Sequence, residues 1–132
     1  MDDSTKASQN SQIVQIPRIS FQKRLFTLEQ ARELFPIVKK ITHAAFVELH
    51  PEITRLQYLR SSGADVAELE CDLEHRIEAW AKKLTKLGCT VKGLWLVDFD
   101  NGDGYYCWKY PEESLDHFHP YDQGFGTRTP IC

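Results

Sequence analysis

The sequence predicts an α+β fold, in which a long antiparallel helical hairpin packs against a small antiparallel β-sheet and an irregular C-terminal wrap. Apolar residues recur at steps of three and four through residues 27–59 and again through residues 66–87, which is the pattern of two amphipathic helices. Residues 91–110 are instead rich in aromatic and β-branched side chains around a run of turn-forming residues. The length of 132 residues suits a single domain.

The beginning of the chain differs in composition from the rest. Residues 1–18 are mostly polar and are predicted to form a disordered or extended tail, followed by one domain over residues 19–132. Within that domain, the helical hairpin is expected over residues 27–88, and the β-hairpin and tail over residues 89–132. A short extended arm, suited to a sheet edge, is indicated by period-two spacing that Lys23 interrupts, at Ile19, Phe21 and Leu25.

The first helix has a clear start and two internal interruptions. Thr27 and Gln30 have the spacing of a capping box, in which each side chain binds the backbone amide of the other residue. Pro36 and Pro51 each remove one intrahelical hydrogen bond, so we expect kinks or a break at these positions.

The second helix is shorter than the first. The turn at residues 61–63 precedes it, Asp65 is a candidate cap and Gly88 ends it. At 1.5 Å per residue the two helices span about 50 Å and 34 Å. The first half of the longer helix therefore needs cover from elsewhere in the chain, and the C-terminal third is the segment available to supply it.

Two strands are expected after the hairpin. They cover residues 91–99 and 105–110, and the intervening Asp-Asn-Gly-Asp-Gly run is strong turn chemistry for a β-hairpin. Pro111 ends the second strand, and the segment after it is expected to be ordered but mostly irregular.

Composition excludes several functional classes. The net charge of −3 and the many acidic residues of the C-terminal third speak against a nucleic-acid partner. No apolar run reaches the roughly 18 residues that a membrane helix needs, and no signal peptide is evident, so the expected location is the cytoplasm. The four cysteines form no CxxC pair and are expected to be free thiols.

Three side chains near the C-terminus are candidate metal ligands. Cys107, Glu112 and His119 supply a thiol, a carboxylate and an imidazole, which suit zinc or another transition metal. Their spacing matches no standard motif, and a Cys107–His119 nucleophile pair lacks a visible oxyanion hole. Strand alternation places Cys107 on the face opposite Trp108. We expect Cys107 to face the helices, which would make the three residues separate structural elements.

Asp98 and Arg128 have two alternative roles. A strand carboxylate and an arginine can form a bidentate pair that locks the C-terminal tail onto the sheet. Arg128 could instead hold an anion, with neighbouring glycines allowing close backbone approach. We favour the tail lock.

Short runs along residues 23–131 resemble the bacterial domain of unknown function 2203 family. They are FTLEQA at 26–31, LFP at 34–36, LGCTVK at 87–92, LVDF at 96–99, CWK at 107–109 with Glu112, His119, GFGTR at 124–128 and PI at 130–131. The resemblance implies a prokaryotic, cytoplasmic source and supports the fold. It supplies no reaction, because that family is itself defined by an unknown function.

The leading functional hypothesis is a non-enzymatic protein-association domain. Two amphipathic helices carry more apolar surface than one small sheet covers, and pairing two hairpins into a homodimer would bury it. The alternative is a metal- or small-ligand-binding protein, including a metal-dependent enzyme, with its site at the C-terminal sheet. The sequence assigns no substrate to either.

Overall fold

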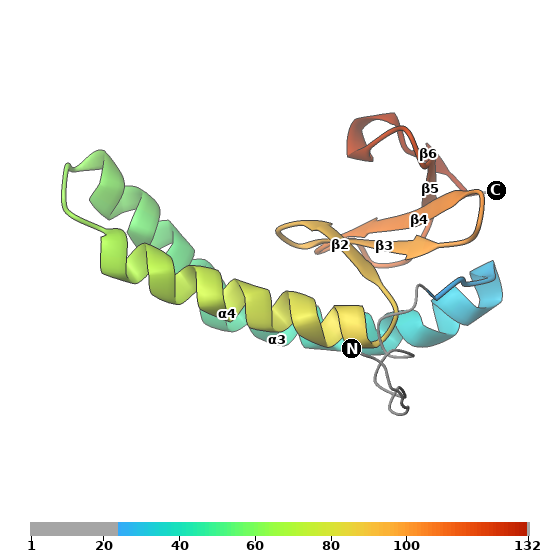
Figure 1. The fold of residues 1–132 in the computed structure, drawn as a ribbon, viewed down its shortest axis with the longest axis horizontal. Coiled ribbons are helices and arrows are strands. Elements are labelled where there is room, and N and C mark those ends of the chain that lie inside the picture. The colour runs from blue at the N-terminus through green and yellow to red at the C-terminus, as the bar shows by residue number, and fades with distance from the viewer. Residues whose placement is uncertain (1–23, 132) are drawn as a thin grey trace, which may run out of the picture.

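The computed structural model describes residues 24–131; the tail at residues 1–18 and the arm residues Ile19 and Phe21 lie outside this range. The described part confirms the α+β fold class, with a helical hairpin and one antiparallel sheet. Figure 1 shows the sheet between the hairpin on one side and the C-terminal segment on the other. The elements are α3 (Leu28–Ser61), α4 (Ala67–Lys86), β2 (Thr90–Gly93), β3 (Leu96–Asp100), β4 (Gly104–Lys109), β5 (His117–Pro120), the 3-10 helix η2 (Phe125–Thr127) and β6 (Thr129–Pro130).

Helix α3 begins at the predicted residue. The Thr27 hydroxyl accepts a hydrogen bond from the Gln30 amide at 3.1 Å, and the Gln30 side chain accepts one from the Thr27 amide at 3.0 Å. The expected break is wrong, because the helix continues through both Pro36 and Pro51. Each proline removes only one hydrogen bond, and the buried side chains of Phe35, next to Pro36, and Leu49, two residues before Pro51, anchor the helix in the core. Figure 1 shows a curved helix.

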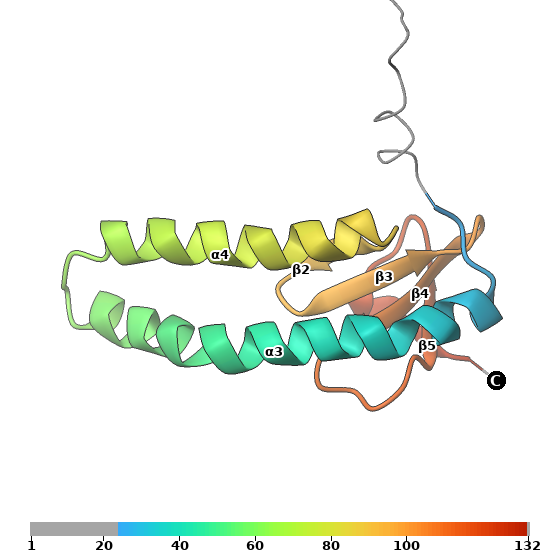
Figure 2. The ribbon, with the colours of Figure 1, turned by 90° about the horizontal axis from the view of Figure 1, so that it is seen from below.

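Helix α4 runs antiparallel to α3, as Figure 2 shows, and ends at the predicted glycine. Gly88 has a φ of +98°, which glycine adopts without steric cost. The Gly88 amide donates to Thr85 at 3.0 Å and the Cys89 amide donates to Leu84 at 3.1 Å, the two bonds of a Schellman motif. At the other end, Val66 occupies the cap position, and the Asp65 carboxylate accepts a hydrogen bond from the Ala67 amide at 3.1 Å.

The single strand expected over residues 91–99 is in fact two strands. Strands β2 and β3 pair antiparallel around a turn at Leu94 and Trp95. Trp95 has a φ of +65°, a strained value for a bulky residue. Its ring is buried against Trp80 and Phe46, and this packing holds the turn. The C-terminal segment is also more regular than expected, since it supplies β5 and β6.

Among the described residues, five strands form one sheet in the order β2-β3-β4-β5-β6. Its helix-facing side carries buried apolar residues, including Val97, Phe99 and Trp108. The Trp108 ring meets Phe35 of α3 edge-on at 5.2 Å, so the sheet covers the N-terminal half of the long helix, as expected (Figure 2). Because strand residues alternate, Cys107 faces away from the helices. The expectation that it packs against them is wrong.

The close approach of β4 to β5 at Gly104 gives a first prediction. A Cβ at Gly104 would lie 2.6 Å from the His119 backbone oxygen, whereas a Cβ at Gly126 would meet nothing within 4 Å. We expect Gly104→Ala to lower the free energy of unfolding by about 1–3 kcal/mol, because the two strands must separate. Gly126→Ala should change it by less than about 0.5 kcal/mol. Urea denaturation of both variants measures the difference, and equal stabilities would contradict the strand packing.

Candidate metal centre

The solvent-side face of the sheet carries a buried cluster of three potential metal ligands. Asp98 of β3, Cys107 of β4 and His119 of β5 each offer one ligand atom, and these atoms lie within 4.8 Å of one another. Asp98 and Cys107 are directly opposite in the β3–β4 register, and His119 is opposite Tyr105 in the β4–β5 register. Every second residue of a strand points to the same face of the sheet. One residue from each of three adjacent strands therefore brings a carboxylate, a thiol and an imidazole together on the face away from the helices.

The imidazole of His119 is held at both ring nitrogens. Nδ1 lies 2.9 Å from the Pro120 carbonyl oxygen, and Nε2 lies 2.9 Å from Asp98 Oδ2. A carbonyl oxygen only accepts, so Nδ1 carries the proton of this bond. Nε2 is thereby directed toward Asp98 and Cys107. A backbone carbonyl that fixes one ring nitrogen while the other faces the ligand set is the usual arrangement of a metal-binding histidine.

The surroundings of the cluster disfavour the charged forms of Asp98 and Cys107. Burial raises the pKa of Asp98, against the lowering effects of Cys107 and His119. Burial, with the nearby Asp98 carboxylate, raises the pKa of the Cys107 thiol to about 12. Asp98 Oδ1 is buried with no hydrogen-bonding nitrogen or oxygen partner among residues 24–131. A bound cation would stabilise both the carboxylate and the thiolate.

Glu112, the predicted third ligand, lies in a different interaction. Its carboxylate pairs with the Arg128 guanidinium through both oxygens, with Nη1 and Oε1 2.9 Å apart. Glu112 also accepts a hydrogen bond from the Lys109 amide at 3.0 Å. The structure therefore places Asp98, rather than Glu112, beside Cys107 and His119. The carboxylate partner of Arg128 is Glu112, not the expected Asp98.

The Glu112–Arg128 pair is charged and partly buried. Burial alone would raise the pKa of Glu112, but hydrogen bonds from Arg128 and the Lys109 amide outweigh it and lower the pKa overall. The hydrogen bond to Glu112 raises the pKa of Arg128, against burial. Arg128 also lies near the Cys107 side chain, whose pKa it acts to lower, and its guanidinium lies 4.1 Å from the centre of the Phe125 ring. This one side chain therefore connects the C-terminal segment to both Glu112 and the cluster.

These features define a small α+β protein with a buried Asp–Cys–His cluster on its sheet. The family model described as an uncharacterised conserved protein, DUF2203, matches residues 24–131, and the chain belongs to this family. No curated protein and no solved structure gives a match. No helix within the described residues is long and apolar enough to cross a membrane.

The ion pair gives a second prediction, with an exposed pair as its control. Arg128→Ala should lower the free energy of unfolding at neutral pH by about 2–3 kcal/mol, since it leaves a partly buried carboxylate without its partner. Arg55→Ala breaks the exposed Arg55–Glu52 pair and should cost less than about 1 kcal/mol.

The same comparison has a defined pH dependence. Because the folded-state pKa of Glu112 lies below its ordinary value of 4.5, the pair stabilises the protein above that pH. This stabilisation is lost as the pH falls through the lowered pKa, so the difference between wild type and Arg128→Ala should shrink in acid. Urea denaturation across the acid range measures it, and a difference that stays constant would exclude the ion pair as its cause.

Proposed function

We propose that this protein binds a transition-metal ion through Asp98, Cys107 and His119. The supporting observation is the convergence of three chemically different ligand atoms, from three adjacent strands, within 4.8 Å at a buried position. Zinc accepts this combination of oxygen, sulfur and nitrogen, at about 2.3 Å from sulfur and 2.0–2.1 Å from nitrogen. Hard cations such as Mg²⁺ and Ca²⁺ prefer oxygen-only sites and fit the set less well.

Three protein ligands leave one position of a tetrahedral zinc ion open. That position would hold water or a small ligand, as in zinc sites that take part in chemistry, whereas structural zinc sites have four protein ligands. The proposal is therefore a ligand-binding metal centre. No reaction is assigned to it.

Metal titration gives the third prediction. Protein purified without an affinity tag should bind one equivalent of Zn²⁺, or of Co²⁺ with absorption from a cobalt–thiolate bond. Cys107→Ser should abolish that absorption, and His119→Ala should weaken affinity by about 100-fold or more, since each removes a ligand. Protein that takes up no stoichiometric metal would contradict the proposal, leaving the three residues as a structural hydrogen-bonded cluster.

Two controls separate metal loss from unfolding. Cys71→Ser removes an exposed thiol of α4 and should leave binding unchanged. Asp98→Asn should weaken metal binding without destabilising the metal-free protein at neutral pH, because it replaces a buried carboxylate whose pKa burial raises with a neutral amide. Circular dichroism and urea denaturation check the folding of each variant.

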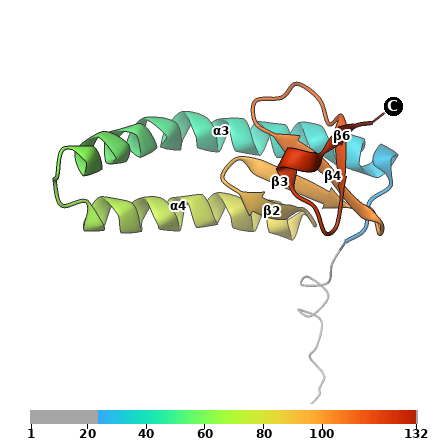
Figure 3. The same cartoon turned by 90° about the horizontal axis from the view of Figure 1, so that it is seen from above.

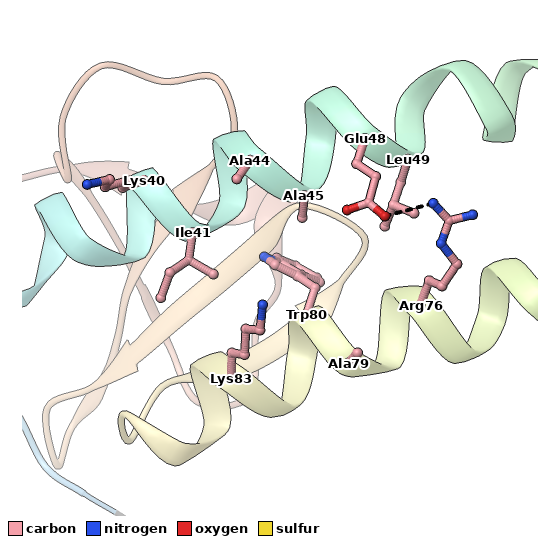
Figure 4. A pocket seen from close by; sticks show the side chains of 10 residues that line it. All are labelled: Lys40, Ile41, Ala44, Ala45, Glu48, Leu49, Arg76, Ala79, Trp80 and Lys83. Atoms are coloured by element: carbon pink, nitrogen blue, oxygen red, sulfur yellow. Dashed lines mark hydrogen bonds and ion pairs between the residues drawn. The ribbon is translucent and has the colours of Figure 1, made fainter.

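A second candidate function, self-association through the helices, is favoured by the face of the hairpin that the sheet leaves open. Ile37, Val47 and Tyr58 of α3 are among the exposed large hydrophobic side chains. Ile37, Ala44, Pro51 and Tyr58 follow at intervals of seven residues, with Val47 three residues after Ala44, so these five residues lie along one side of the helix and are called the apolar seam here. Beside this seam lies a hollow of about 410 Å³ between the helices (Figure 4).

The lining of the hollow suits a close helical neighbour. Ala44, Ala45 and Ala79 have small side chains that would allow another helix to approach, and Trp80 lies at the floor between the two helices. In Figure 4 the sheet lies behind the two helices, so the sheet does not cover the hollow. We propose a second copy of this chain as the occupant, forming a four-helix bundle.

Light scattering tests this assembly as the fourth prediction. The wild-type protein should be a dimer at micromolar concentration, and the double variant Ile37→Glu, Val47→Glu should be a monomer, because four buried carboxylates at the seam would have no partners. Leu25→Glu changes a similarly exposed apolar residue that precedes α3 and should leave the dimer intact. A monomeric wild type with intact helices would contradict the proposal.

A further inference from the structure

The metal centre is closed on the helix side by the aromatic core. Trp108, Phe99 and Val97 fill that side of the sheet and are fully buried. Asp98, Cys107 and His119 are themselves buried, so solvent and ions have no direct route to them. Access therefore requires movement of whatever covers the opposite face of the sheet.

That cover is the C-terminal strap, defined here as residues 121–131. In Figure 1 the strap lies on the side of the sheet opposite the helices, and in Figure 3 its 3-10 helix η2 lies over β3 and β4. Residues 121–127 are all exposed, and a Cβ at either Gly124 or Gly126 would meet nothing within 4 Å. The middle of the strap is therefore thinly packed. Segments with few buried contacts open at low free energy.

The strap is fixed mainly near its two ends. Tyr121 donates a hydrogen bond to Asp100 at 2.6 Å, and Ile131 donates its amide to Asp116 at 2.7 Å. Strand β6 pairs with β5 over only two residues, one of which is a proline without an amide hydrogen. The strongest attachment is the two-point ion pair between Arg128 and Glu112, whose side chains are only 15% and 27% exposed.

Arg128 also links the strap to the cluster of Asp98, Cys107 and His119. Its guanidinium lies near the Cys107 side chain and stacks on Phe125, which is also part of the strap. Breaking the pair with Glu112 would release the side chain that holds the strap against Cys107. The β4–β5 ladder and the helix-facing core do not depend on this contact.

We propose that the Glu112–Arg128 pair is a latch, and that its release opens the strap and exposes Cys107 and the metal centre while the helix–sheet core stays folded. The functional meaning of the latch, control of metal entry and release, rests on the proposed function above. The opening itself does not, and it can be measured on the metal-free protein.

Two buried thiols provide an internal comparison. Cys107 lies under the strap, and Cys89 lies in the helix–sheet core. Both thiols are buried in the folded protein, so each is labelled only when the part of the structure that covers it opens. The metal-free full chain is treated with N-ethylmaleimide, and labelling of each cysteine is followed by peptide mass spectrometry. Local opening labels Cys107 alone, whereas global unfolding labels both cysteines.

The variant that tests the latch is Glu112→Gln, which keeps Arg128 and the side-chain shape. We expect Cys107 labelling to accelerate about tenfold, as for loss of a partly buried ion pair, and to stay much faster than Cys89 labelling, which requires global unfolding. Hydrogen exchange of residues 128–131 should accelerate in parallel, which excludes a change in thiol reactivity alone. Glu113→Gln, at the exposed neighbour that contacts Lys39, is the matched control and should change neither readout.

Labelling of Cys107 at no faster a rate than Cys89, or no acceleration at Cys107 in Glu112→Gln, would overturn the latch. With Zn²⁺ added, Glu112→Gln should speed both uptake and release about tenfold while the equilibrium affinity changes little. Failure of the protein to bind Zn²⁺ would remove the metal proposal but leave the labelling result standing. Normal Zn²⁺ binding with unchanged labelling would remove the latch alone.

Discussion

The pleat of β4 is the constraint on which both faces of the sheet depend. Trp108 is fully buried against Phe35, and its indole nitrogen donates a hydrogen bond to the Glu112 carbonyl at 2.8 Å. With Trp108 directed to the helices, alternation directs Cys107 to the opposite face. A register slip of one residue would exchange the two and place a thiol in the aromatic core. Burial of this tryptophan therefore sets the composition of the proposed metal centre.

The two carboxylates of the solvent-side face are in different electrostatic surroundings. Glu112 has a guanidinium partner, and its pKa is lowered on balance. Burial keeps the pKa of Asp98 raised, although Cys107, His119 and Lys92 each act to lower it. The guanidinium of Arg128 pairs with Glu112 and not with Asp98. Asp98 and Cys107 are left as a pair of acidic groups that a divalent ion would stabilise, which is the physical basis of the metal proposal.

Local sequence signals predicted the ends of the helices well, because the capping chemistry lies within a few residues. The Thr27–Gln30 capping box and the Gly88 terminus are such cases. The turn at Leu94–Trp95 could not be predicted in this way. A tryptophan at positive φ violates the local preference, and only its packing against Trp80 and Phe46, distant in sequence, stabilises it.

The candidate site shows the same division between local and distant information. Nearness to Cys107 in sequence favours Glu112 as a ligand, yet the chain turns after β4 and the Glu112 side chain pairs with Arg128. Asp98 could have been found from the hairpin itself. Asp98 and Cys107 are equidistant from the centre of the Asn101–Gly104 turn, so an antiparallel hairpin places them opposite each other. No comparable spacing in the sequence identifies Glu112 as the partner of Arg128, because that pairing depends on the path of the C-terminal strap.

The layered arrangement lets the two proposed activities occupy separate surfaces. The hollow and the apolar seam lie on the hairpin face that the sheet leaves open, whereas the strap lies beyond the sheet (Figures 1 and 4). A dimer formed through the hairpins would therefore leave the strap free to open in both copies. The aromatic core between the layers is close-packed, and such cores transmit strain. Ring contacts cross from the helices to the sheet at Trp80 with Trp95 and at Phe35 with Trp108, so the helix surface and the strand that carries Cys107 share one packed core.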